Sequence, residues 1–110
     1  MSEHLVVLVT APSESAGRDI ADVLLGMRLC ACVSILPSVT SLYVWKGEVC
    51  QDEEVLLLIK TSATRFDELA ATVRQNHPYD VPEIIATPIV EGSSDYLTWI
   101  DDSVSVEELD

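Results

Sequence analysis

The sequence has few basic residues, few glycines and no long apolar run, and each scarcity excludes a class of protein. Lysine and arginine together number 6 against 19 aspartate and glutamate residues, which gives a formal net charge of −13. A nucleic-acid-binding surface needs clustered Lys and Arg against phosphate, so nucleic acid is not an expected partner. The 4 glycines and 5 prolines exclude a collagen-like or low-complexity chain. No segment approaches the roughly 20 apolar residues of a membrane-spanning helix, so a membrane is not an expected partner either.

Cysteine is also scarce, and its pattern argues against a disulfide framework. The chain has 3 cysteines, Cys30, Cys32 and Cys50, and its N-terminal segment lacks the basic region of a secretory signal peptide. We therefore expect three reduced thiols and a cytoplasmic location. If Cys30 and Cys32 lie on one strand, their side chains share a face and could hold a soft ion such as Cu(I). The simpler interpretation is that both pack as small apolar core residues.

The length of 110 residues fits one domain, and 48% hydrophobic residues are enough for a core. The apolar run over 5–10 predicts a buried strand, and Ser13 is placed to cap an amphipathic helix over 14–28. The remaining expected elements are a β-rich segment over 30–45, a tight turn at Lys46-Gly47, a strand over 48–61, a helix over 63–76, a strand over 81–90 and a short helix over 93–100. Pro37 in the β-rich segment requires a bulge, a bend or an edge position.

This order, β-α-β-β-α-β plus a C-terminal helix, predicts an α+β, ferredoxin-like sandwich. Both main helices of that pattern pack on one face of the sheet, so the other face would be polar if it met water. The runs LVVLV (5–9) and VLLLI (55–59) are instead apolar at every position, and therefore on both faces. No further element of the chain is left to cover the second face. Another copy of the same chain is the simplest cover, because a bare apolar patch marks an interface.

Five stretches, in this order, resemble the divalent-cation tolerance protein CutA family: VVLVTAPSE, CACVSILPSVTSLYVWKGEV, EEVLLLIKT, HPYDVPEII and DYLTWI. Together they cover about residues 5–101. The resemblance implies a single CutA-like, ferredoxin-fold domain over 1–110, with an acidic tail from about 103. It implies a compact homotrimer in which the long hairpin strands pair with neighbouring subunits. It also implies a role in divalent-cation tolerance, copper in particular, and a cleft between subunits for a metal ion or small polar ligand.

The resemblance further implies which residues line that cleft: Thr10, Lys60, His77, Tyr79 and Glu83. In metal-binding members the implied ligands are a cysteine just before the threonine of the first strand and two adjacent histidines before Pro-Tyr. This chain has Val9 and Asn76 at two of these three positions, which leaves His77 as a weak metal candidate. A single histidine without a thiol is a poor site for copper, so we expect only weak binding of a divalent cation and assign no definite cofactor.

The residues themselves leave several roles open. His77 could bind a ligand, act as a general acid or base, or form the polar end of a helix stripe, where it suits the helix C-terminus. Lys60 and Glu83 each border an apolar strand, which favours an ion pair between adjacent strands or subunits; joint contact with an anionic or zwitterionic ligand is the alternative. Tyr43 and Trp45 share a strand face, where packing is favoured over stacking on a cofactor.

No enzyme signature occurs in the sequence: HExxH, GxSxG, a P-loop and GxGxxG are all missing. We therefore do not expect an enzyme. Two classes of function remain. The first is a trimer that binds a small ligand or metal ion in cation homeostasis, and the second is a trimeric scaffold or signalling adaptor whose partners are proteins. Selective binding of a cation or metabolite in the cleft would favour the ligand-binding trimer. A stably co-purifying protein together with an empty cleft would favour the scaffold or adaptor.

Overall fold

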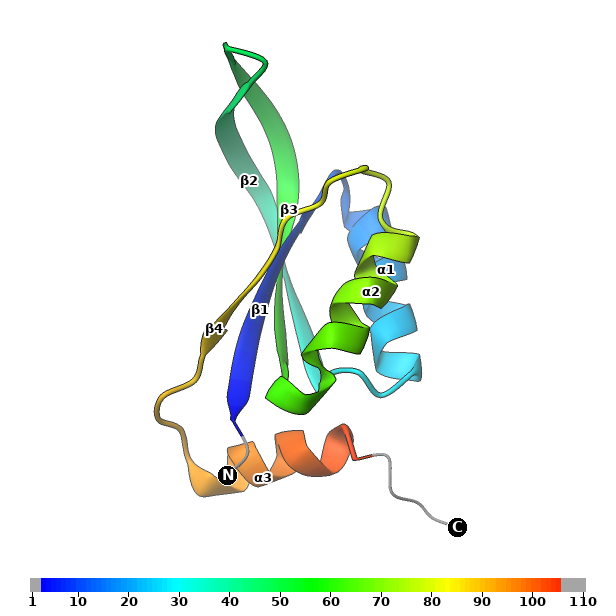
Figure 1. The fold of residues 1–110 in the computed structure, drawn as a ribbon, viewed down its shortest axis with the longest axis vertical. Helices are drawn as coiled ribbons and strands as arrows, with labels where there is room; N and C mark the ends of the chain where they lie inside the picture. Colours follow the sequence, from blue (N-terminus) through cyan, green and yellow to red (C-terminus); the bar gives the residue numbers. More distant parts are fainter. Residues whose placement is uncertain (1–2, 106–110) are drawn as a thin grey trace.

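The computed structural model describes residues 3–105 and has a four-stranded antiparallel sheet with helices on one face (Figure 1). The strands are β1 (His4–Ala11), β2 (Cys32–Trp45), β3 (Glu48–Ser62) and β4 (Ile84–Pro88); the helices are α1 (Glu14–Gly26), α2 (Phe66–Asn76) and α3 (Ser94–Ser103), with a 3-10 turn at Ala63–Arg65. The strand order is β2-β3-β1-β4. With the element order, this confirms the predicted βαββαβ pattern and its additional C-terminal helix. None of the helices described is long and apolar enough to cross a membrane.

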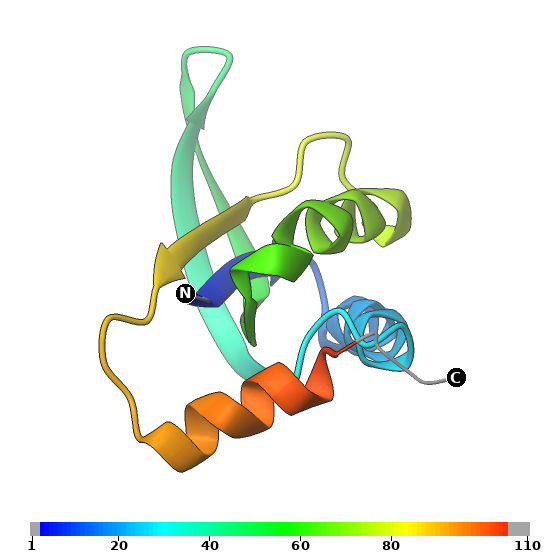
Figure 2. The same ribbon diagram turned by 60° about the horizontal axis from the view of Figure 1, so that its bottom comes forward.

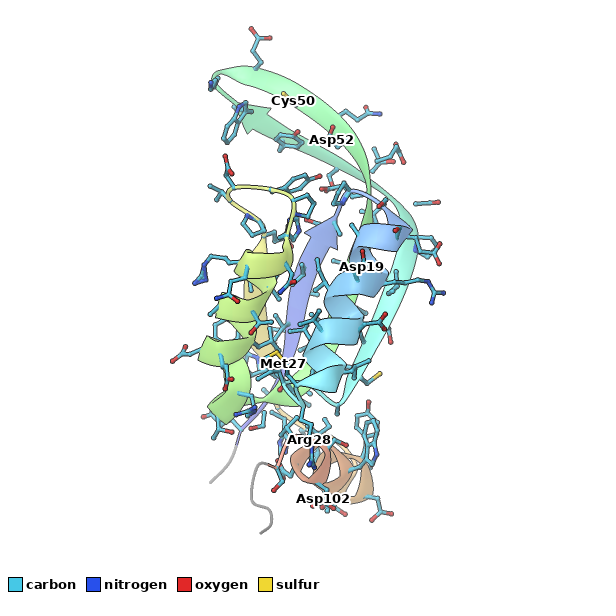
Figure 3. The ribbon with its side chains drawn as sticks, turned by 90° about the vertical axis from the view of Figure 1, so that its right-hand side faces the viewer. Asp19, Met27, Arg28, Cys50, Asp52 and Asp102 are labelled. Atoms are coloured by element: carbon cyan, nitrogen blue, oxygen red, sulfur yellow. The ribbon has the colours of Figure 1, made fainter. Side chains whose placement is uncertain are left out.

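Helix α1 begins at the predicted residue, and Arg28, two residues beyond its end, contacts α3. The Ser13 side chain accepts a hydrogen bond from the Ala16 backbone N–H at 3.1 Å, which caps α1. Just beyond the helix, Arg28 has a φ of +58°, which turns the chain away from the helix axis. Its guanidinium donates hydrogen bonds to the backbone carbonyls of Asp102 and Ser103 at 3.4 and 3.3 Å (Figure 3). These bonds satisfy the C-terminal carbonyls of α3, which lies across one end of the molecule (Figure 2).

The core lies between the sheet and the pair α1 and α2. Alternate residues of the central strands point into it, and Val7, Val9, Leu57 and Ile59 are all fully buried. Gly17 allows the close approach of α1 to β3, because an added Cβ would lie 3.1 Å from the Leu57 side chain. Burial of these side chains is the main stabilising contribution, at about 1.5–3 kcal/mol for each large one.

The opposite side of the sheet is apolar as well, but α1 and α2 do not cover it. Paired residues across the strands place one apolar set on this side, which we call the open face: Leu8, Leu36, Leu56, Leu58 and Ile85. Leu36 is 38% exposed and Ile85 is 53% exposed. The prediction of a sheet that is apolar on both faces is therefore correct, and the protomer leaves its second face partly bare.

The β2–β3 hairpin extends well beyond the rest of the sheet. Residues 39–54, the hairpin arm, pair only with each other, because β1 meets β3 over 55–62. Lys46 and Gly47 have positive φ values of 54° and 80°, as a two-residue hairpin turn requires. A bulge between Leu36 and Val39 accommodates the proline, as predicted. The arm accounts for much of the 50 Å length of the molecule.

Several boundaries differ from the predictions. Strand β4 spans 84–88 and not 81–90, because the preceding residues form a loop that crosses the end of β1. Helix α3 continues to Ser103, three residues beyond its predicted end, and Val104 after it is buried. Much of the predicted acidic tail, residues 106–110, lies outside the described part of the chain.

The cysteines are all free thiols, as predicted. Cys30 does not lie on a strand with Cys32, however, because β2 begins at Cys32 and Cys30 lies in the connection before it. Cys30 is 2% exposed and belongs to the core cluster, which supports the core interpretation over a thiolate metal site. Burial is the largest cause that raises the pKa of its thiol to about 12.

Alkylation should distinguish Cys30 from the other two thiols. With iodoacetamide at pH 8, the native protein should leave Cys30 unlabelled, because its thiolate is scarce and its sulfur is buried. After denaturation, intact-mass measurement should show labels on all 3 cysteines. A denatured but unreduced protein that takes only one label would reveal a disulfide and contradict this assignment.

Candidate functional site

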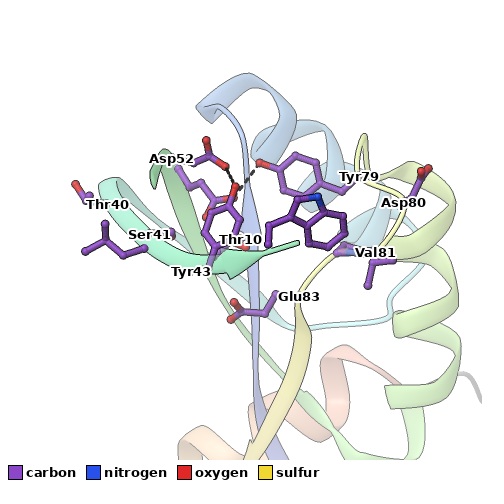
Figure 4. Close-up of a pocket in the computed structure, with 13 residues that line it drawn as sticks. Thr10, Thr40, Ser41, Tyr43, Asp52, Tyr79, Asp80, Val81 and Glu83 are labelled. Carbon is purple, nitrogen blue, oxygen red and sulfur yellow. Dashed lines mark hydrogen bonds between the residues drawn. The ribbon is translucent and has the colours of Figure 1, made fainter. Parts of the chain in front are cut away.

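A cleft of about 900 Å³ opens between the hairpin arm and the loop 79–83 (Figure 4). The arm supplies one wall and the loop the other, and Thr10 contributes from the end of β1. The full lining is Thr10, Thr40, Ser41, Leu42, Tyr43, Trp45, Asp52, Glu54, Tyr79, Asp80, Val81, Pro82 and Glu83. Strand alternation places Thr10 and Glu54 on the same side of the sheet as the open face.

His77 holds the start of this loop in place. It ends α2 in an extended conformation, as the residue before a proline prefers, and its side chain is buried. Its Nε2 lies 2.7 Å from the Thr10 backbone carbonyl, which can only accept, so Nε2 carries the proton. The Tyr79 backbone N–H donates to Nδ1 at 3.1 Å. The imidazole is therefore neutral, and both of its nitrogens are engaged.

These two hydrogen bonds leave His77 without a free nitrogen for a metal ion. The one lone pair of the ring, on Nδ1, already accepts the Tyr79 N–H, so a metal could bind only by displacing that bond. Over residues 3–105, no group of three or more His, Cys, Asp or Glu side chains is arranged to hold a metal ion. Of the roles left open by the sequence, the polar end of the α2 stripe fits His77 best.

Two tyrosine–carboxylate pairs lie side by side in the cleft. The Tyr79 hydroxyl donates to Glu54 Oε2 at 2.9 Å, and the Tyr43 hydroxyl donates to Asp52 Oδ2 at 2.5 Å. Burial and then the Glu54 hydrogen bond raise the pKa of Tyr79 to about 12. The Asp52 hydrogen bond is the largest cause that raises the pKa of Tyr43 to about 12. Through Tyr79 and Glu54, the loop held by His77 is tied to the hairpin arm.

The cleft carries negative charge with nothing in its lining to balance it. Its lining includes 4 acidic residues, Asp52, Glu54, Asp80 and Glu83, and contains no lysine, arginine or histidine. Glu54 is only 9% exposed. A concave surface of one charge sign concentrates counterions, so the ligand that this cleft favours is a cation.

Of the five predicted cleft residues, Thr10, Tyr79 and Glu83 line the cleft, and His77 bonds to Thr10 and Tyr79 without lining it. Lys60 lies elsewhere in the protomer. It pairs with Val6, which is four residues, or roughly 13 Å, along β1 from Thr10. Its ammonium donates to Ser34 Oγ at 3.1 Å. Within residues 3–105 of one chain, Lys60 and Glu83 form no ion pair. An ion pair between Lys60 of one subunit and Glu83 of another stays a prediction.

Sequence reasoning missed the acidic wall of the arm. Asp52 and Glu54 stand in the run QDEE, which looks like a solvated charged stretch. Strand alternation indicates that both side chains share a face, and that signal was available. The approach of Tyr79 to Glu54 was not, because it depends on the path of the loop after His77.

Comparison with known proteins gives one consistent family. The family model described as CutA1 divalent ion tolerance protein matches residues 5–103. The divalent-cation tolerance protein CutA of Thermus thermophilus is 53% identical over 95 residues, which are 86% of this chain and 92% of that protein. The crystal structure of CutA1 from Oryza sativa superposes with a TM-score of 0.92 at 43% identity, covering 96% of each chain. The structure named periplasmic divalent cation tolerance protein CutA, from Archaeoglobus fulgidus, has a TM-score of 0.90 at 36% identity and covers 93% of this chain and 99% of that one.

The two tyrosine–carboxylate pairs predict different responses to loss of their carboxylates. Asp52→Asn should lower the pKa of Tyr43 most of the way to its ordinary value of 10.0, because the Asp52 bond is the largest cause of its shift. Glu54→Gln should lower the pKa of Tyr79 less, because burial contributes more. NMR titration of ¹³C-labelled tyrosine rings measures both.

The sign of the linked stability follows from the raised pKa. Because the folded-state pKa of Tyr79 lies above its unfolded value of 10.0, its contribution is complete below pH 10 and is lost as pH rises toward 12. Equal pKa changes in the two variants, or native tyrosines that titrate at their ordinary value, would contradict this description of the cleft.

Proposed function

This chain belongs to the CutA1 divalent ion tolerance protein family, and we propose that it acts as a homotrimer that binds a cationic or small polar ligand in clefts between its subunits. The single observation that carries the proposal is the open face, an apolar side of the sheet that no element in residues 3–105 fully covers. The role is one of binding in divalent-cation tolerance, copper included, and not one of catalysis.

The open face supports assembly of identical copies. The hairpin arm carries a second set of strongly exposed apolar residues, Leu42 at 67%, Val44 at 70% and Val49 at 77%, which strand pairing places on the side opposite to the open face. Monomeric proteins rarely leave apolar patches of this extent in water. The arm also presents unpaired strand edges, which favour pairing with another chain. Three copies is the number that the family resemblance implies.

The position of the cleft supports a site between subunits. Thr10 and Glu54 lie on the same side of the sheet as Leu56 of the open face. A copy that covers the open face therefore approaches the cleft as well. Lys60 also lies on this side, with a neutral hydroxyl as its hydrogen-bond partner, and is available to an acidic group of a neighbouring copy.

The free thiols support a cytoplasmic location. Cys32 and Cys50 are partly exposed and unpaired, and such thiols persist in reducing compartments. One relative, from Archaeoglobus fulgidus, is named periplasmic. The proposal for this chain rests on its own cysteines.

Assembly can be tested on two exposed apolar residues. Multi-angle light scattering of the wild type at micromolar concentration should give the mass of a trimer. Ile85→Asp places a charge on the open face and should dissociate it, because an unpaired buried charge costs about 3–5 kcal/mol. Leu25→Asp is the matched control: Leu25 is 43% exposed on α1, away from the open face, and its variant should stay trimeric. A stable folded wild-type monomer would refute the proposal.

Copper binding can be tested by calorimetry with Cu²⁺ and Zn²⁺ on the wild type and His77→Ala. We expect weak, poorly selective binding, micromolar or weaker, because both His77 nitrogens are engaged and Val9 and Asn76 supply neither a thiol nor an imidazole. His77→Ala should change the affinity little but reduce the free energy of unfolding by about 1–3 kcal/mol, since it leaves buried backbone groups unpaired. Nanomolar binding that is lost in His77→Ala would instead establish a true metal site.

A further inference from the structure

We propose that the cleft between the hairpin arm and the loop 79–83 binds an organic cation with a flat, delocalised head group of the guanidinium type. The inference rests on the proposed function in placing a ligand in this cleft, and it adds the chemical class of that ligand. It is carried by three features of the cleft: a buried carboxylate with an unused oxygen, an aromatic wall, and the lack of a metal-binding arrangement.

The buried carboxylate belongs to Glu54. Only 9% of this residue is exposed, and it lines the cleft. Its Oε2 accepts the Tyr79 hydroxyl, while its Oε1 has no hydrogen-bond partner in residues 3–105. No cation in this part of the chain forms an ion pair with it. Oε1 is not among the buried atoms without a partner in residues 3–105, so it remains accessible and can accept a hydrogen bond from a positive group that enters the cleft.

Aromatic rings make up the second feature. Tyr43 and Trp45 contribute from the arm, and Tyr79 contributes from the loop. Trp45 is 58% exposed, so much of its indole is free for contact. A cation over the face of an aromatic ring is attracted by the ring quadrupole, and tryptophan is the strongest partner. Tyrosine hydroxyls that donate to Asp52 and Glu54 keep these carboxylates oriented.

The arrangement disfavours a compact metal ion. The 4 carboxylates of the lining come from both walls, Asp52 and Glu54 from the arm and Asp80 and Glu83 from the loop (Figure 4). They form no cluster of the kind that holds a metal. A guanidinium suits this geometry better, because it donates through five N–H groups, stacks on aromatic faces and is weakly hydrated.

The experiment uses the assembled protein with Trp99→Phe, which leaves Trp45 as the only tryptophan of the 2 in the chain. The probes are n-butylguanidinium and its neutral isostere n-butylurea, titrated while Trp45 fluorescence is recorded. We expect saturable binding of the guanidinium, at least tenfold tighter than that of the urea.

Two matched variants locate the site. Glu54→Gln keeps an acceptor for the Tyr79 hydroxyl but removes the charge, and it should weaken binding at least tenfold. Glu53→Gln removes the same charge from the adjacent residue, which is exposed, points to the other face of the arm and does not line the cleft. It should change the dissociation constant less than twofold.

The outcomes separate this inference from the proposed function. Equal weakening in both variants would show general attraction to an acidic surface, and it would overturn the inference. Absence of guanidinium binding to an intact trimer would also overturn the inference, because the cleft would then be empty or filled by a neighbouring copy. That result would not affect the conclusions from the assembly and Cu²⁺ measurements. Loss of the trimer in light scattering would instead refute the proposed function.

Discussion

The cleft depends on one neutral imidazole with two hydrogen bonds. His77 donates to the carbonyl of Thr10 and accepts from the backbone of Tyr79, so it joins the end of β1, the end of α2 and the following loop. Tyr79 then donates to Glu54, which joins that loop to the hairpin arm. These contacts hold the loop 79–83 facing the arm and so support the second wall of the cleft. Each bond lost in the interior costs about 1–3 kcal/mol, enough to free the loop locally.

Assembly and ligand binding have separate physical origins in this account. The proposed assembly rests on the apolar open face, since helices α1 and α2 cover only the other side of the sheet. The proposed ligand binding rests on unbalanced carboxylates and aromatic rings of the arm and of the loop 79–83. The two meet because the cleft lies on the open-face side, where a second copy would approach. A cation bound there would lie close to the interface, so its binding can be coupled to the stability of the assembly.

The sequence predicted the elements well and the site in part. Periodicity and turn residues placed α1, α2 and the long hairpin, because burial and local chemistry coincide in those segments. Within one protomer Lys60 lies four residues along the sheet from Thr10, and its place in a cleft between subunits stays a prediction, because the sequence of one chain does not show how copies meet. Cys30 was considered part of a strand because its apolar surroundings resemble one. The state of His77 could not be predicted, because both of its partners are backbone groups, which leave no side-chain pattern.

Long-range ¹H–¹⁵N NMR of the His77 ring tests most directly whether the imidazole is neutral with both nitrogens in hydrogen bonds. The chain has 2 histidines, so a variant at His4 assigns the signals. The account predicts a protonated Nε2 and an unprotonated, hydrogen-bonded Nδ1, with both shifts unchanged when Zn²⁺ is added. A protonated Nδ1 with a free Nε2, or a shift of either nitrogen on addition of Zn²⁺, would contradict it.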